Sequence, residues 1–133
     1  MHTTEGLVSK PCAGSVETVW NRLLETLNTL NVPLFATVDH AANARTAGLF
    51  MPETRVAFFG KPAVGTHLML ERPEVALELP LRIVISEVPG EGTMLFMPDI
   101  LWLAHRYGID PQLDSLRKTL GFMALVSDKV CGD

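Results

Sequence analysis

The segment from residue 81 to residue 97 constrains the fold of this chain most strongly. Leu81, Ile83 and Ile85 occupy every second position of one run, and a period of two is typical of a β-strand with one buried face. Residues 89–92 (Pro-Gly-Glu-Gly) predict a turn, and the apolar run over residues 93–97 predicts a second strand. We therefore expect an antiparallel hairpin.

Helical patterns lie on both sides of this hairpin. Ser15 is a favourable N-cap, and the stripe that follows it predicts an amphipathic helix with Val16, Val19, Trp20, Leu23, Leu24, Leu27 and Leu30 on its apolar face. Asp99 is expected to cap a helix that ends at Tyr107. A last helix is expected over about residues 110–129, because Asp110 followed by a proline is typical of a helix start.

Shorter elements are predicted between the first helix and the hairpin. The partly β-branched run over residues 34–38 predicts a strand that ends at Asp39. Asp39 then caps an alanine-rich helix, which Gly48 ends. Residues 54–59 are apolar on both faces, as in an inner strand.

This order of elements predicts an α+β fold. With 133 residues, the chain has the length of a single domain, which we assign to residues 1–133. Crossover-like connections combined with a hairpin favour a mostly antiparallel or mixed sheet, with helices packed mainly on one face.

Composition excludes some classes of function. Eleven Lys and Arg against fifteen Asp and Glu give a net charge of −4, and the basic residues are scattered, so neither nucleic acid nor a membrane surface is an expected partner. The chain also lacks a run of about twenty apolar residues and a signal-like start, so we expect a cytoplasmic protein. Cys12 and Cys131 are then expected to be reduced, small apolar residues rather than a disulfide.

Three ordered motifs resemble the small bacterial and archaeal family known as domain of unknown function 302. They are residues 38–42 (Val-Asp-His-Ala-Ala) with Arg45 and Gly48, residues 59–66 (Phe-Gly-Lys-Pro-Ala-Val-Gly-Thr) with Leu68 and Met69, and residues 77–82 (Leu-Glu-Leu-Pro-Leu-Arg). The resemblance covers about residues 15–108. It implies a TATA-binding-protein-like α+β fold, a homodimer and no established activity.

The chain departs from the usual family pattern at a few of these positions. Lys61 stands where the family usually has Asn, His67 where it has Pro, and Glu78 where it has Asp. The pair at residues 96–97 is Phe-Met in place of a common Tyr-Asn pair.

The pair Asp39 and His40 is the first candidate site. At a strand-to-helix junction, a histidine of lowered pKa could act as a general base oriented by the neighbouring carboxylate. The other interpretation is structural, with Asp39 as the N-cap and His40 in a packing or hydrogen-bonding role.

The glycine pair Gly60 and Gly65, followed by Thr66, is the second candidate. It follows a predicted strand and resembles a phosphate-binding loop. It lacks the lysine that such loops place before the hydroxyl residue, and Pro62 removes one amide. A tight turn that needs glycine at positive φ is the alternative.

A metal or haem site is the third candidate. His40, His67 and His105, with Met69, Met94 and Met97, carry ligand types that copper and haem iron accept. No pair has a diagnostic spacing such as His-Glu-x-x-His, so the methionines also fit the role of core gap fillers.

These observations favour a binding module over an enzyme or an inert protein. We expect a homodimer that holds a small-molecule or anionic ligand in a cleft lined by Asp39, His40, Gly65 and Thr66, with Glu78 nearby, because sites usually lie on loops and strand ends. An enzyme with His40 as base is the alternative, and the sequence names no cofactor. The dimer is expected because one thin helical layer cannot cover both apolar faces of such a sheet.

Overall fold

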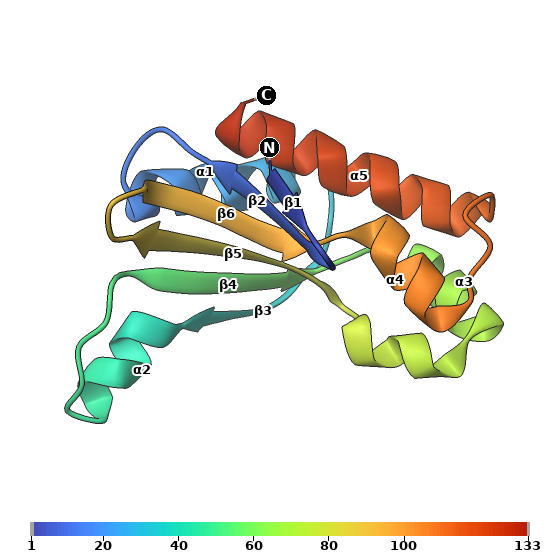
Figure 1. The fold of residues 1–133 in the computed structure, drawn as a ribbon, viewed down its shortest axis with the longest axis horizontal. Helices are drawn as coiled ribbons and strands as arrows, with labels where there is room; N and C mark the ends of the chain where they lie inside the picture. Colours follow the sequence, from blue (N-terminus) through green and yellow to red (C-terminus); the bar gives the residue numbers. More distant parts are fainter. Residues whose placement is uncertain (1, 133) are drawn as a thin grey trace.

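One antiparallel sheet of six strands, in the order β1-β2-β6-β5-β4-β3, forms the centre of the computed structural model, which describes residues 2–132 (Figure 1). The strands are β1 (His2–Thr4), β2 (Leu7–Pro11), β3 (Leu34–Asp39), β4 (Thr54–Phe59), β5 (Leu81–Val88) and β6 (Gly92–Pro98). The β5–β6 hairpin is confirmed, and β4 is an inner strand between β5 and β3.

Five α-helices and a short 3-10 helix are described: α1 (Val16–Thr29), α2 (His40–Thr46), α3 (Pro62–Glu71), η1 (Pro73–Glu78), α4 (Ile100–Tyr107) and α5 (Asp114–Cys131). Three of the predicted caps are confirmed. Ser15, Asp39 and Asp99 each accept hydrogen bonds from first-turn amides of α1, α2 and α4. Gly108 ends α4 at φ 65°, in the left-handed region that glycine adopts without strain.

The core lies on one face of the sheet. Directly paired strand residues point to the same face, so Ala57 and Ile83 lie on one side with Ile85 and Leu95. These residues share a core cluster with the buried stripes of α1 and α5, such as Leu23 and Met123. The predicted α+β fold, with helices mainly on one face, is therefore confirmed.

The opposite face of the sheet lies outside that core cluster. The strand register places one apolar row across four strands there: Val38 of β3, Val56 of β4, Val84 of β5 and Phe96 of β6. Val38, Val84 and Phe96 are only half-buried. We call these four residues the open-face row.

Two strands and one helix boundary differ from the sequence predictions. Strands β1 and β2 were not predicted, because Leu7–Pro11 is short and carries Lys10 on its core side. Helix α5 begins at Asp114 rather than Asp110, since Asp110 instead accepts the Gln112 amide in the preceding turn. The proline after Asp110 therefore belongs to that turn and not to the helix.

The turn predicted at Gly60 and Gly65 is wrong. Neither glycine has a positive φ, and Gly65 lies inside α3. Its amide donates to the Lys61 carbonyl at 3.1 Å, as in an ordinary helical turn. This amide is therefore not free to cradle a phosphate.

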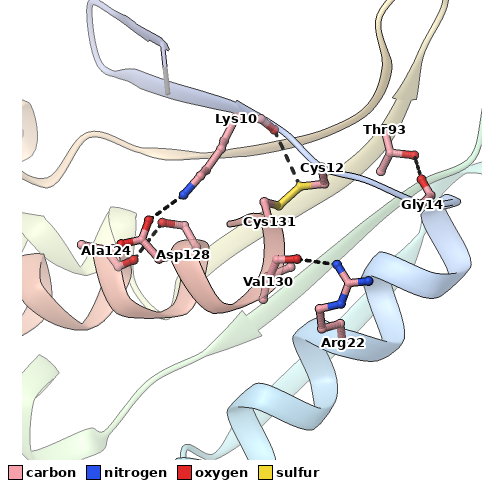
Figure 2. The surroundings of a disulfide bond; sticks show 10 residues. Lys10, Cys12, Gly14, Arg22, Thr93, Ala124, Asp128, Val130 and Cys131 are labelled. Atoms are coloured by element: carbon pink, nitrogen blue, oxygen red, sulfur yellow. Dashed lines mark hydrogen bonds and ion pairs between the residues drawn. A yellow bond between two sulfur atoms is a disulfide. The ribbon is translucent and has the colours of Figure 1, made fainter. Parts of the chain in front are cut away.

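The prediction of reduced cysteines is also wrong, because Cys12 and Cys131 form a disulfide with Cα atoms 4.4 Å apart (Figure 2). The bond joins the end of β2 to the end of α5. Beside it, the Lys10 ammonium contacts the Asp128 carboxylate at 2.5 Å, and the Arg22 guanidinium donates to the Val130 carbonyl at 2.7 Å. The unpredicted strand β2 is what brings the first cysteine to α5.

Candidate functional site

A cavity of about 510 Å³ lies between α3, α5 and the adjoining ends of β4 and β5. Its volume falls in the range typical of small-molecule sites. Its lining consists of Phe35, Phe59, Gly60, Lys61, Pro62, Val64, Gly65, Thr66, Leu68, Met69, Ala76, Leu79, Pro80, Leu81, Lys118, Thr119 and Phe122.

The cavity walls are predominantly apolar. Phe59, fully buried at the end of β4, meets Phe122 of α5 edge to face, with ring centroids 6.0 Å apart. Leu68 of α3 and Leu81 of β5 are buried parts of the same core. An apolar group that enters this space would therefore contact side chains that the core already holds in place.

Four lining residues have polar side chains, and none of the lining residues is acidic. The Thr119 hydroxyl already donates to the Ser115 carbonyl at 2.8 Å. The Lys118 ammonium lies 3.0 Å from the exposed carboxylate of Asp114, whereas no carboxylate of residues 2–132 lies within 4.0 Å of the Lys61 ammonium. The polar groups left to a ligand are thus mainly two lysine ammoniums and the Thr66 hydroxyl.

A second hollow of about 430 Å³ adjoins the first and shares Val64 and Lys118 with it. It is more polar, since its lining includes His67, Glu71, Asp114 and Ser115. The buried Ser115 hydroxyl has no hydrogen-bond partner among the described residues.

The residues predicted to line one cleft lie in separate parts of the structure. Gly65 and Thr66 line the cavity from α3, as predicted for ligand-binding residues. Asp39, His40 and Glu78 are not among the lining residues.

Asp39 and His40 lie at the junction of β3 and α2, and Figure 1 places α2 at the opposite end of the sheet from α3. The Asp39 carboxylate accepts the Ala42 amide at 2.9 Å and lies 3.8 Å from Arg55. His40 is exposed, and no hydrogen bond joins it to Asp39 in the described part of the chain. The geometry therefore agrees with the capping role of Asp39.

Glu78 forms a small polar cluster at the end of η1. Its carboxylate accepts from Arg82 at 2.9 Å and from the Tyr107 hydroxyl at 2.5 Å. This hydrogen bond to Glu78 is the main reason why the pKa of Tyr107 is raised, with desolvation and the negative charge of Glu78 acting in the same direction. The cluster joins η1, β5 and α4.

The three histidines proposed as metal ligands lie on three helices, with His40 on α2, His67 on α3 and His105 on α4, and all three are exposed. Within residues 2–132, no group of three or more His, Cys, Asp or Glu side chains could hold a metal ion.

Most cavity residues were missed by sequence reasoning. Helix α3 is apolar around most of its circumference, through Val64, Leu68, Met69 and Leu70. The lack of a single apolar stripe was the feature of the sequence that could have pointed to the cavity. A helix of that kind needs apolar contacts on more than one side. The three phenylalanines of the cavity come from separate elements, so no local pattern links them.

The fold and the cavity define a class, namely small α+β domains with an antiparallel sheet and a mainly apolar, solvent-open cavity. The family described as domain of unknown function DUF302 matches residues 8–124, and the chain belongs to this family. A solved structure with the same fold is an uncharacterised conserved DUF302 protein from Bacillus stearothermophilus, with a TM-score of 0.82, 18% identity and coverage of 96% of this chain and 99% of that one.

Curated relatives carry a different kind of name. Proteins from Brucella suis and Brucella abortus, each named fluoride-specific ion channel FluC 1, are 32% identical over 115 residues, which is 86% of this chain. This chain spans only 45% and 43% of their respective lengths. No helix among the described residues has the length and apolar character needed to cross a membrane.

Proposed function

We propose that this protein is a homodimeric module that binds a small molecule in the cavity between α3 and α5. The single observation that carries the binding proposal is the cavity itself, which combines apolar walls with a few polar groups at a volume suited to a small ligand. Gly65 supports it, since glycine inside a helix is unfavourable by about 0.5–1 kcal/mol relative to alanine and its place here is on the cavity wall.

The other functions considered from the sequence lack such support. A general base at His40 would need an oriented partner, and the Asp39 carboxylate is engaged by the α2 amide instead. A metal site would need convergent ligands, and the three histidines come from different helices. Binding is the function that the described residues favour.

The binding proposal is tested with an uncharged, environment-sensitive naphthalene dye. We expect saturable fluorescence enhancement with the natural chain and its loss in Gly65→Phe, because a Cβ at Gly65 lies 3.6 Å from Leu79, itself a cavity residue. Gly121→Phe is the matched control, since a Cβ there meets open space and Gly121 does not line the cavity. Equal binding by the natural chain and Gly65→Phe would contradict the proposal.

The dimer is proposed from the open-face row. Its four apolar residues lie side by side across the sheet, on the face opposite the helical core, where Val56 is buried and the other three are half-buried. The loop after α2 also exposes Leu49, Phe50 and Met51, of which Phe50 is 92% exposed. A second copy of the chain would cover such a face by two-fold pairing, in which both chains use the same patch.

Light scattering after gel filtration tests this pairing. We expect twice the 14.6 kDa mass of one chain at micromolar concentration, and the single mass for Val84→Lys, which places a charge in the open-face row. Leu125→Lys, at an exposed position of α5, should stay dimeric. A single-chain mass for the natural protein would exclude the dimer.

We also propose a cytoplasmic location. The cytosol keeps most protein thiols reduced, so the Cys12–Cys131 disulfide would be an exception there. Cell fractionation should recover the oxidised chain with cytosolic markers, and its recovery outside the cytosol would contradict this location.

A further inference from the structure

Building on the proposed binding function, we infer that the cavity takes an amphiphilic monoanion: a carboxylate attached to an acyl or aromatic body. The body occupies the apolar space beside the Phe59–Phe122 ring pair, and the carboxylate lies at the rim with Lys61 and Lys118.

The walls define the body of the ligand. Apolar residues supply most of the lining, and Phe59 of β4, Leu68 of α3 and Leu81 of β5 are the buried ones among them. The Thr119 hydroxyl of α5 is already bonded to the Ser115 carbonyl. A sugar or a nucleobase would leave its polar edges without partners there, which is unfavourable in an apolar site. An alkyl chain or an aromatic ring loses nothing by entering.

The rim defines the charge of the ligand. Lys61 and Lys118 line the cavity and no acidic residue does, so an anion is attracted and a cation is not. Lys118 contacts Asp114, but both side chains are largely exposed, and such an ion pair contributes little. Breaking this ion pair therefore costs little free energy, so Lys118 can turn to a ligand.

The geometry of α3 acts in the same direction. Lys61 is the N-cap residue of α3 and makes no side-chain capping bond. The positive end of the α3 dipole therefore lies beside Lys61, one of the two lysines that line the cavity. One anionic group complements the two lysines and the helix dipole. A polyanion would find no further cationic side chains, because the rest of the lining contains none.

The test compares straight-chain carboxylates, from hexanoate to dodecanoate, with the primary alcohols of equal length by calorimetry on the full chain. Affinity should rise by about fourfold per added methylene until the cavity is filled, which corresponds to the burial of one CH₂ group. Each carboxylate should bind more tightly than its alcohol by several-fold at low salt, since exposed ion pairs contribute up to about fivefold each.

Variants assign this preference to the rim. Lys61→Met combined with Lys118→Met should remove the advantage of the carboxylate while leaving alcohol binding within about twofold. Lys129→Met, at an exposed position near the other end of α5, should keep the advantage. Gly65→Phe should abolish binding of both series.

Each outcome bears on a different claim. Equal affinities for carboxylates and alcohols, both lost in Gly65→Phe, would overturn the anionic ligand and leave the cavity as a binding site. Carboxylate binding that survives Gly65→Phe would place the interaction elsewhere on the surface and overturn the inference. If neither series nor the neutral dye bound, the proposed function itself would fail.

Discussion

The two ends of helix α5 have opposite characters. At its C-terminal end, a disulfide, an ion pair and a guanidinium–carbonyl hydrogen bond tie the helix to β2 and α1 within one short stretch (Figure 2). At its N-terminal end, Lys118, Thr119 and Phe122 border a cavity instead of packing fully against neighbours.

This difference separates the part of α5 that stabilises the fold from the part that lines the candidate site. A cavity forfeits van der Waals contacts that a filled core would have, so the helix that borders it must be held elsewhere. In this chain the covalent and ionic contacts near Cys131 hold α5, while Lys118, Thr119 and Phe122 line the cavity. The following predictions test that division, beginning with the largest expected effect.

Replacing Cys12→Ala together with Cys131→Ala should lower the free energy of unfolding by up to about 5 kcal/mol, because the bond spans 119 residues and restricts the unfolded chain. Urea unfolding measures the loss. A reductant should destabilise the natural chain similarly and leave the double variant unchanged. A loss below about 1 kcal/mol in the free energy of unfolding would show that the disulfide contributes little to holding the C-terminal end of α5 in place.

Asp128→Ala should cost about 2 kcal/mol, because it leaves the ammonium of Lys10, whose side chain is 2% exposed, without its carboxylate. The value is below that of a fully buried pair because the Asp128 side chain is 45% exposed. Adding Lys10→Met should recover most of the loss in the same urea assay. A double variant as unstable as Asp128→Ala would show that the unpaired charge is not the cause.

Gly65→Ala should raise the free energy of unfolding by about 0.5–1 kcal/mol through helix propensity, since its Cβ would lie at an ordinary 3.6 Å from Leu79. It should also weaken dye binding, because the methyl group enters the cavity. Gly121→Ala should stabilise by a similar amount without affecting the dye. Destabilisation by Gly65→Ala would mean that α3 needs glycine for backbone reasons.

Tyr107→Phe should change the pH dependence of stability. The pKa of Tyr107 is raised above 10.0, chiefly by its hydrogen bond to Glu78, so this hydroxyl stabilises the fold fully below pH 10.0 and progressively less as the pH rises toward its folded-state pKa. Urea unfolding at increasing alkaline pH should show a shallower decline in the variant. Tyr107 is the only tyrosine of the chain, so ultraviolet titration follows its ionisation directly; an unshifted titration would contradict the prediction.

The candidate site was only partly predictable from sequence. Gly65 and Thr66 were expected to bind a ligand, and they do line the cavity, but as parts of a helix rather than of a phosphate loop. Asp39 and His40 were grouped with them because all lie in motifs near strand ends, a criterion that says nothing about which end of the sheet each one occupies. Glu78 was expected nearby, and its chain neighbour Leu79 lines the cavity, although Glu78 itself does not.

The amino-acid sequence alone determined the elements whose causes are local. The apolar stripe of α1, the alternation in β5 and the caps at Ser15, Asp39 and Asp99 depend on residues a few positions apart, so they were correctly predicted. The Cys12–Cys131 bond and the cavity depend instead on segments far apart in the chain that only the packed core brings together. Strand β2 meets α5 because the sheet adds it beside β6, and the phenylalanines of three elements meet because α3 and α5 pack over one end of that sheet. Tertiary packing decided both, since residue spacing carries no information about which distant surfaces will be neighbours.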